Sequence, residues 1–246
     1  MQVLILAGTS DATSLVRQLE GHRTIRIQVS LAGRTKAPEV PDLPHRIGGF
    51  GGAEGLAAYL REAGIDALVD ATHPFATGMT ATAVTAAGAA GVPLAILRRP
   101  EWEPRPGDHW LSVTSLAAAA DALRDLGHRV LVTSGRQGLA AFERIPDKHY
   151  VIRTIDPPEP APELPDAVYL QARGPFRVDQ EHALLEEHGI EVMVSKASGG
   201  EATCAKLAAA RECGIPVVMV ERPAEPAGVP AFQHASEVVR WLERQG

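Results

Sequence analysis

The segment 70–76 holds the residues of this chain that are best placed for chemistry. It reads Asp-Ala-Thr-His-Pro-Phe-Ala and follows the apolar run 65–69, which is typical of a strand buried on both faces. Open α/β sheets bind ligands at the carboxyl ends of their strands, so this position favours a ligand site. His73 could donate a proton, because imidazole titrates near neutral pH. In the alternative reading, Asp70 and Thr72 only cap the next helix and His73 fills a loop.

A second polar turn follows the amino-terminal apolar run 3–6. Gly8, Thr9 and Ser10 stand between an expected first strand and first helix, where backbone N–H groups and the helix dipole can hold a phosphate. The dinucleotide-binding fingerprint has three glycines and this turn has one, so the motif is weak. Simple capping of the helix by Ser10 or Asp11 is the structural alternative.

The end of the expected second strand, 25–30, predicts which nicotinamide cofactor would bind. An acidic residue there takes the 2′-hydroxyl of NAD, whereas a cation accommodates the 2′-phosphate of NADP. The chain carries Arg34, Thr35 and Lys36 and no acid, which favours NADPH, although two solvated surface cations are the plainer explanation. The glycine-rich run 48–52 marks another loop that can approach a ligand closely. The residues expected to bind the cofactor are Gly8, Thr9, Ser10, Arg34, Thr35, Gly49, Gly51, Thr72, His73 and Pro74.

Composition limits the class of protein. A chain of 246 residues is ordinary for two domains. A net charge of −6 and 4% aromatic residues argue against nucleic-acid binding. Cys204 and Cys213, placed within one expected helix without metal-ligand spacing, predict a reducing compartment and no metal site. The amino terminus lacks the pattern of a signal peptide and no apolar run could span a bilayer, so we expect a cytoplasmic protein without membrane partners.

The second half of the sequence resembles the first. Three segments recur in the same order at an offset of roughly 125 residues, which indicates two units of similar topology. The aligned pairs are 60–69 with 185–194, 70–75 with 195–200, and 91–100 with 214–223. The sequence therefore predicts an α/β protein with two Rossmann-like parallel-sheet domains and an interdomain cleft, the usual place for a small ligand.

A proline-rich stretch, 103–108, separates the two halves and marks the expected domain boundary. Residues 1–103 are expected to form the NADP-binding domain and residues 108–224 the substrate side of the cleft. Residues 225–246 are expected to add a carboxyl-terminal loop and helix.

Five segments, taken together, resemble the precorrin-6A reductase family of cobalamin biosynthesis. They are 5–12, 48–52, 70–76, 99–102 and 196–200, and they occur in the family's order over nearly the whole chain. The third and the last of these segments, Asp-Ala-Thr-His-Pro-Phe-Ala and Lys-x-Ser-Gly-Gly, are the most specific. The resemblance implies NADPH-dependent reduction of one carbon–carbon double bond of the ring-contracted tetrapyrrole precorrin-6A, giving precorrin-6B. Spacing alone supports a narrower statement: a two-domain α/β protein with a nucleotide-like first domain and a polar cleft.

A corrin precursor carries several carboxylates and the chain as a whole is acidic, so any attraction must be local. Cations near the expected strand ends could form such a patch through bidentate contacts, although about half of them would be solvated or salt-bridged instead. These cations are Arg98, Arg99, Arg136, Arg153, Arg173 and Lys196. The residues expected to bind substrate are Arg99, Ser134, Gly135, Arg136, Arg173, Lys196, Ser198, Gly199 and Gly200.

The cofactor would carry the hydride, and the protein would supply position and charge. His73 and Lys196 are the expected catalytic residues, the first as proton donor and the second to offset charge or position a water; protonation from solvent stays open. Another NADP-dependent reductase is one alternative, although Tyr59, Tyr150 and Tyr169 offer no Tyr-x-x-x-Lys pair. A two-lobed ligand-binding protein is the other, although it would normally carry an export signal. Cobalt in the substrate, and the choice between a monomer and a small homo-oligomer, stay open.

Overall fold

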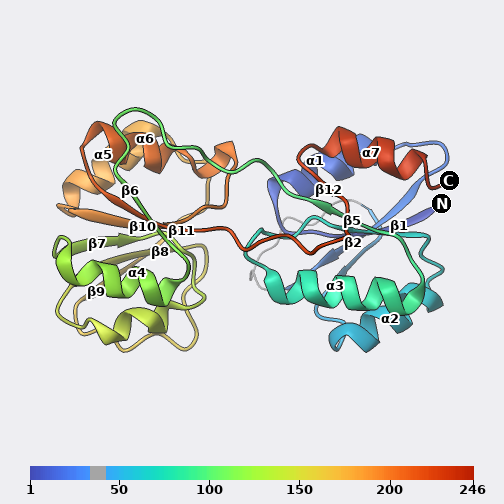
Figure 1. Ribbon diagram of the computed structural model, residues 1–246, viewed down its shortest axis with the longest axis horizontal. Coiled ribbons are helices and arrows are strands. Elements are labelled where there is room, and N and C mark those ends of the chain that lie inside the picture. Colours follow the sequence, from blue (N-terminus) through green and yellow to red (C-terminus); the bar gives the residue numbers. More distant parts are fainter. Residues whose placement is uncertain (34–42) are drawn as a thin grey trace. The chain divides into compact units, whose positions relative to one another are not determined.

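The computed structural model describes residues 1–33 and 43–246 (Figure 1). The expected cofactor residues Arg34 and Thr35, and the neighbouring Lys36, lie outside the described residues. The chain divides into two compact units, one made of Met1–Pro100 and Pro223–Gly246, the other of Glu101–Arg222. Each unit is an α/β domain built on one parallel sheet.

The first unit has a six-stranded sheet in the order β12-β5-β4-β1-β2-β3, with all pairs parallel. Its strands are β1 (Gln2–Leu6), β2 (Arg26–Leu31), β3 (His45–Ile47), β4 (Ala67–Asp70), β5 (Leu94–Leu97) and β12 (Ala231–Phe232). Its helices are α1 (Ser10–Leu19), α2 (Gly52–Glu62), α3 (Thr77–Ala90) and α7 (Ala235–Glu243). Helices α1 and α7 cover one face and α2 and α3 the other (Figure 1).

The second unit repeats this plan in the order β6-β11-β10-β7-β8-β9, again with all pairs parallel. Its strands are β6 (Trp110–Val113), β7 (Arg129–Val132), β8 (His149–Thr154), β9 (Ala167–Gln171), β10 (Val192–Lys196) and β11 (Val217–Val220). Its helices are α4 (Leu116–Ala122), α5 (Val178–Glu187) and α6 (Ala205–Glu212), with short 3₁₀ turns η1 (Leu123–Asp125), η2 (Leu139–Arg144) and η3 (Glu201–Thr203). Helices α5 and α6 pack on one face of the sheet (Figure 1).

Buried strands explain why the sheets are parallel and covered on both faces. In β1, Val3 and Ile5 pack toward α1 and α7, whereas Leu4 and Leu6 pack toward α2 and α3. All four side chains are almost completely buried. A strand that is apolar on both sides has no solvent face, so each sheet needs helices on both of its faces.

The two sheets share one topology and exchange their last elements. Five strands of each sheet come from one half of the chain, in matching order. The sixth strand of each sheet follows the five strands of the other sheet in the sequence. β6 and α4 come directly after β5 but belong to the second unit. β12 and α7 come after β11 but belong to the first unit. The segment 225–246, expected as a separate loop and helix, thus packs on the first unit, and the units change at Pro100 and Arg222 rather than at 103 and 224.

Several local expectations need correction. The alanine-rich run 116–126 predicts one continuous helix, but α4 ends at Ala122 and the chain continues as a 3₁₀ turn. A helix is also predicted after the hydroxyl–glycine turn that ends at Gly138, and the structure has the 3₁₀ turn η2 there. Cys204 and Cys213 flank α6 as its capping residues and do not lie within it. Within the described ranges, none of the helices has the length and apolar character needed to cross a membrane.

Candidate functional site

Parallel pairing brings the carboxyl ends of the strands to one edge of each sheet. In the first unit this edge gathers the turn after β1, the glycine-rich loop after β3, the segment 70–76 after β4 and the arginines after β5. Thr9 joins two of them directly, because its hydroxyl donates a hydrogen bond to the carbonyl of Ala71 at 2.9 Å. The spatial grouping expected from the sequence is present within this unit.

The turn between β1 and α1 leaves open space beside the backbone. Gly8 has a φ of +133°, which favours glycine, and a Cβ built on it would meet no atom within 4 Å. Thr9 is the N-cap of α1 and accepts a hydrogen bond from the amide of Ala12 at 3.1 Å. The alternative of a cap by Ser10 or Asp11 is therefore wrong. Gly8 and the start of α1 form the kind of cradle that receives a phosphate.

Arg46 organises the glycine-rich loop. Its guanidinium donates to the carbonyls of Gly48 and Gly49, at 2.9 and 2.8 Å, and lies 3.8 Å from the centre of the Phe50 ring. Gly51, the N-cap of α2, lies in the left-handed region, with a φ of 79°. Two cofactor candidates, Gly49 and Gly51, are thus exposed on a loop whose shape an arginine and an aromatic ring hold in place.

Asp70 is a buried hub at the end of β4. Its carboxylate accepts hydrogen bonds from the Thr72 amide and hydroxyl at 3.0 and 2.6 Å, from the Thr80 hydroxyl at 2.6 Å and from Arg98 at 2.8 Å. Burial alone would raise the pKa of Asp70, but the Arg98 charge and these hydrogen bonds outweigh it and hold the pKa below its ordinary value. The α3 N-cap is Ala76, without a side-chain hydrogen bond, so the alternative of capping by Asp70 and Thr72 is wrong.

His73 is half-buried, and one of its ring nitrogens contacts the backbone of the same segment. Its Nδ1 accepts a hydrogen bond from the Phe75 amide at 3.2 Å, and the two rings are 5.9 Å apart. An accepting Nδ1 leaves Nε2 as the nitrogen that carries the proton in the neutral ring. Pro74, next to it, lines a cavity of about 380 Å³ together with Thr77 and Arg98.

The two arginines after β5 have partners within the first unit. Arg98 is 5% exposed, donates to the Thr72 carbonyl at 3.0 Å and lies with its Nε 3.2 Å from Glu225. Arg99 donates to Asp11 in α1 at 2.7 Å. Arg98 therefore stabilises the carboxyl edge of the first sheet through buried contacts. It is one of the expected cations that form a salt bridge within the protein.

In the second unit, the segment 196–200 follows β10 as 70–76 follows β4. The Ala197 amide donates to Val220 at 2.8 Å, and Arg222 donates to the Ser198 carbonyl at 3.0 Å. The Trp102 indole donates to the Gly200 carbonyl at 2.8 Å. Burial lowers the pKa of Lys196. The segment is held by three neighbours from other parts of the chain.

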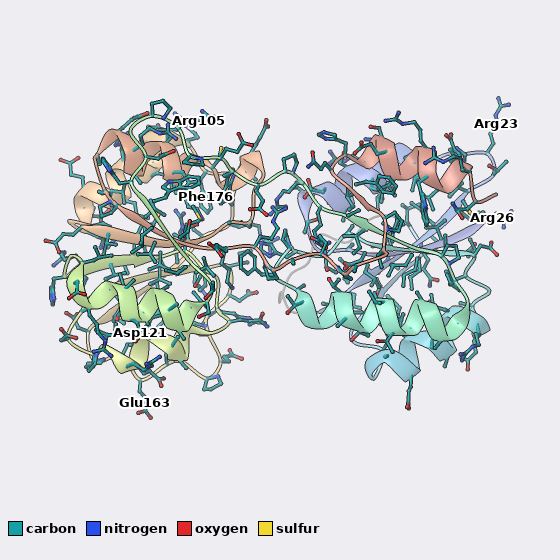
Figure 2. The ribbon with its side chains drawn as sticks, viewed as in Figure 1. Arg23, Arg26, Arg105, Asp121, Glu163 and Phe176 are labelled. Atoms are coloured by element: carbon teal, nitrogen blue, oxygen red, sulfur yellow. The ribbon has the colours of Figure 1, made fainter. Side chains whose placement is uncertain are left out.

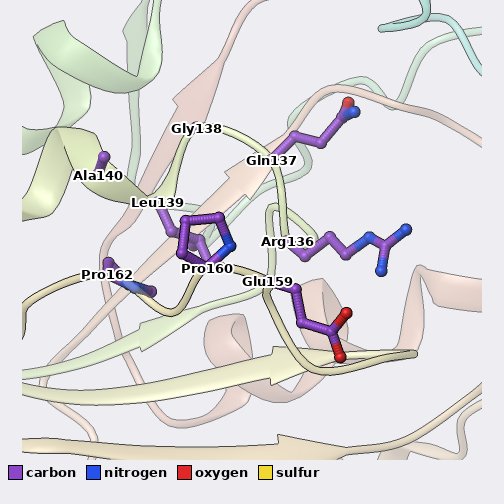
Figure 3. A pocket seen from close by; sticks show the side chains of 8 residues that line it. All are labelled: Arg136, Gln137, Gly138, Leu139, Ala140, Glu159, Pro160 and Pro162. Atoms are coloured by element: carbon purple, nitrogen blue, oxygen red, sulfur yellow. The ribbon is translucent and has the colours of Figure 1, made fainter. Parts of the chain in front are cut away.

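A pocket of about 550 Å³ lies where β7 and β8 end (Figure 3). Arg136 lines it from the segment after β7, and Glu159 from the segment after β8. Ser134, just before Arg136 in the chain, is buried, and its hydroxyl has no hydrogen-bond partner among the described residues. Gly135 has a φ of +78°. This turn occupies the same position in the second sheet as the Gly8 turn in the first.

The other expected cations of the second unit differ in burial. Arg173 is exposed, in a segment tied to η3 by a hydrogen bond from the Phe176 amide to the Ala202 carbonyl at 3.1 Å. Arg153 is buried, donates to Glu181 at 2.6 Å and lies over the Phe176 ring, which Figure 2 labels. Arg153 is therefore part of the core and not of an exposed patch.

Three side chains that organise these segments were missed by the sequence analysis. Arg46, Arg222 and Lys206 each contact a candidate loop or its support, but nothing in their spacing shows it. Lys206 stands out in sequence only as a single charge among the alanines and leucine of 205–210. No three His, Cys, Asp or Glu side chains come together as metal ligands within the described parts of the chain.

Known proteins match this chain over nearly its whole length. The family model for precorrin-6x reductase CbiJ/CobK matches residues 2–243. A precorrin-6A reductase of Rhodococcus erythropolis is 48% identical over 241 residues, which are 98% of this chain and 97% of the relative. A cobalt-precorrin-6A reductase of Priestia megaterium is 28% identical, over 99% of this chain and 98% of the relative.

A solved structure described as CobK precorrin-6A reductase covers 100% of this chain and 97% of its own, with a TM-score of 0.93 and 42% identity. Sequence family, relatives and fold all point the same way. The chain belongs to the precorrin-6x reductase CbiJ/CobK family, a family of oxidoreductases of cobalamin biosynthesis.

Proposed function

We propose that this chain is a cytoplasmic, NADPH-dependent reductase that adds hydrogen across one carbon–carbon double bond of precorrin-6A, giving precorrin-6B. The observation that carries the proposal is the family match over residues 2–243. The polar strand ends of the two units supply a place for each reactant. The cleft between the domains stays a prediction from the sequence.

The cofactor would lie on the first unit. Gly8, with open space beside its backbone, and the exposed Ser10 at the start of α1 suit a pyrophosphate. The hydroxyls of Thr9 and Thr72 are already in use, so their backbone groups would make the contacts. Gly49, Gly51, His73 and Pro74 would complete this set, with Arg34 and Thr35 at the 2′-phosphate. When bound, NADPH supplies the hydride.

The substrate would be an anionic tetrapyrrole held by the second unit. Arg136, at the pocket after β7, and Lys196, after β10, are its expected anchors, with Gly135 and 198–200 as close backbone contacts. Arg173 is exposed and near the same loops through the 176–202 hydrogen bond. Ser134 has a buried hydroxyl that a ligand group or a water would satisfy. Arg99 would add a contact from the first unit.

Two groups are the proposed sources of the proton that must follow the hydride. To donate the proton His73 must be an imidazolium, which carries a proton on both ring nitrogens and so gives up the hydrogen bond that Nδ1 accepts from Phe75. Burial lowers the pKa of Lys196, which makes its ammonium a better acid near neutral pH. A solvent proton is the remaining source.

The metal-free substrate is the better candidate. Identity is 48% to the precorrin-6A reductase and 28% to the cobalt-precorrin-6A reductase, both over nearly full length. The same match argues against a two-lobed binding protein and against a reductase of another family.

The test is anaerobic oxidation of NADPH by the purified protein. We expect NADPH to be consumed only after metal-free precorrin-6A is added, more slowly with its cobalt form, and little with NADH in its place. Consumption without any tetrapyrrole, or none with either tetrapyrrole, would contradict the proposal.

A further inference from the structure

Three ionisable side chains are buried together between the second sheet and helices α5 and α6. Arg153 of β8 and Glu181 of α5 form an ion pair at 2.6 Å, with exposed fractions of 7% and 1%. Lys206 of α6 is 4% exposed. Its Nζ donates to the Thr133 hydroxyl at 3.0 Å, and no carboxylate of the described residues lies within ion-pair distance of it. A protonated Lys206 therefore gives the cluster one more positive than negative charge.

The proton on Lys206 is held weakly for this reason. Burial lowers the pKa of Lys206 most, and the Arg153 charge lowers it further. Glu181 and Cys204 raise it, and the result is a pKa of about 7. These are the charged and titratable groups that face it from β8, from α5 and from the residue before α6. The ammonium is thus gained and lost near neutral pH.

The same ammonium lies over an aromatic ring that holds a candidate substrate loop. Nζ of Lys206 is 5.4 Å from the centre of the Trp102 ring, within the range of a cation–π contact. The indole of Trp102 also donates its N–H to the Gly200 carbonyl at 2.8 Å. Trp102 packs against the core cluster that α6 helps to form. One side chain therefore connects Lys206 to the end of the segment 196–200.

We propose that Lys206 is a positioning residue for the segment 196–200, which it holds through the indole of Trp102. The inference rests on the proposed function, because there this segment binds the anionic tetrapyrrole. Below neutral pH the ammonium attracts the face of the ring, and the ring keeps Gly200 in place. Above neutral pH the charge is lost, the attraction disappears, and the segment loses one of its anchors.

Hydrogen exchange of the protein without ligands tests the proposal. Below pH 7 we expect amides of 196–200 to exchange about tenfold faster in Lys206→Met than in the natural protein, since a desolvated cation–π contact is of that order. Trp102→Phe removes the hydrogen bond to Gly200 and should have a similar effect. Lys148→Met is the matched control, because Lys148 is also buried in this unit but donates to Leu126.

Fluorescence of the natural protein adds a measurement that needs no variant to fold. The emission of Trp102 should change with a midpoint near pH 7, because a charge is gained or lost beside its ring. The change should vanish in Lys206→Met and Trp102→Phe and persist in Lys148→Met. A transition that survives in Lys206→Met, or unaltered exchange of 196–200 in that variant, would overturn the proposal.

Kinetics separates this inference from the proposed function. In an active enzyme, Lys206→Met should raise the KM for the tetrapyrrole several-fold and leave kcat and the KM for NADPH nearly unchanged. A lost fluorescence transition with an unaltered KM would show that the lysine does not position the substrate loop. An inactive natural protein would contradict the proposed function, and the exchange and fluorescence results would still decide whether Lys206 holds the loop.

Discussion

His73 and Lys206 illustrate how a single contact decides what a titratable side chain can do. In His73 the hydrogen bond from the Phe75 amide to Nδ1 favours the neutral ring, with its proton on Nε2, over the imidazolium that a proton donor needs. For Lys206 the only hydrogen-bond acceptor among the described residues is the Thr133 hydroxyl, so the charge of the ammonium is poorly compensated. The sequence singles out His73 and not Lys206, and for both residues the partner decides what the side chain can do.

Removing the His73 imidazole should show whether it donates the proton. If it does, His73→Ala lowers the single-turnover rate at saturating NADPH by about 10²–10⁴-fold, as is typical of a lost general acid. The Nδ1 contact favours a smaller effect, with the loss in NADPH affinity, because the ring then mainly shapes the loop. A near-normal rate of hydride transfer would exclude His73 from the chemistry and favour Lys196 or solvent.

The preference for NADPH should depend on Arg34, a residue outside the described ranges. Arg34→Ala should raise the dissociation constant of NADPH about tenfold or more, on the scale of one charge-assisted hydrogen bond. NADH binding should change little, since NADH has no 2′-phosphate. Equal weakening of both cofactors in a fluorescence titration would place Arg34 away from that phosphate.

The buried Lys206 should also make stability depend on pH. Its pKa falls from 10.5 to about 7 on folding, so the unfolded chain binds the additional proton between these values. Stability therefore rises with pH from about 7 to about 10.5, and the cost of the buried charge is fully present below 7. Lys206→Met removes that cost, on the order of a few kcal/mol near neutral pH.

Urea unfolding at several pH values checks this expectation. Lys206→Met should be more stable than the natural protein at about pH 6. The difference in the free energy of unfolding should narrow as the pH approaches the pKa of a free lysine. A constant difference across the range would mean that Lys206 keeps its ordinary pKa in the folded state.

At the scale of elements, the edge of the first sheet depends on one carboxylate. Asp70 ends β4, receives the Thr80 hydroxyl from α3 and receives Arg98 from the end of β5. Arg98 in turn contacts Glu225, in the segment that leads to β12. Four elements thus meet at a buried charge pair, which sets the position of the 70–76 segment.

Breaking this pair should cost more than removing it. Asp70→Asn leaves the buried guanidinium of Arg98 with less compensation, and we expect a loss of about 3–5 kcal/mol in the free energy of unfolding. The double variant with Arg98→Met should recover part of that loss. Additive effects of the two changes in urea unfolding would show that the pair is not coupled.

Acid should destabilise the natural protein, as Asp70→Asn does, because it neutralises the same carboxylate. The pKa of Asp70 is held below its ordinary value, so its stabilising effect is present above about 3.8 and is lost as the pH falls through the lower, folded-state pKa. The Asn variant should lack this part of the acid transition.

The sequence predicted the elements with a clear period and missed those without one. Apolar runs such as those of β1 and β4, and the spacing of Ala12, Leu15, Val16 and Leu19 in α1, predicted strands and helices that the structure confirms. The two-residue β12 carries no such pattern, and the 3₁₀ turn η2 was expected as a helix. Short elements depend on tertiary contacts, which the local sequence does not contain.

Candidate residues were predictable as positions and not as contacts. Parallel strands deliver their carboxyl ends to one edge, so the fold class predicted that the polar strand ends would gather there, whereas the contact between Thr9 and Ala71 was not predicted. The partners of Arg98 and Arg153 did not follow, because Asp70, Glu225 and Glu181 come from elsewhere in the chain. A cation at a strand end can bind a ligand or a buried acid, and only the fold distinguishes them.

At the scale of the whole molecule, each half of the chain completes the other's sheet. The exchange leaves Leu242 of α7 fully buried in the first unit and Leu123, after α4, fully buried in the second. The ends of the sequence, β1 and α7, therefore belong to one folding unit although the other unit lies between them in the chain. A carboxyl-terminal change should act on the amino-terminal domain.

Matched core substitutions test this exchange. Leu242→Ala should destabilise the first unit by about 2–5 kcal/mol, the usual cost of such a cavity, and Leu123→Ala should do the same to the second. Hydrogen exchange read peptide by peptide would show faster opening of β1, α1 and β5 in the first variant, and of β7, β10 and β11 in the second. Each substitution should therefore affect the unit to which its leucine belongs. It should leave the other unit unaffected, although most of that unit's strands come before the leucine in the sequence. Faster exchange of β10 and β11 in Leu242→Ala, with β1 unaffected, would mean that α7 packs on the unit that precedes it in the chain.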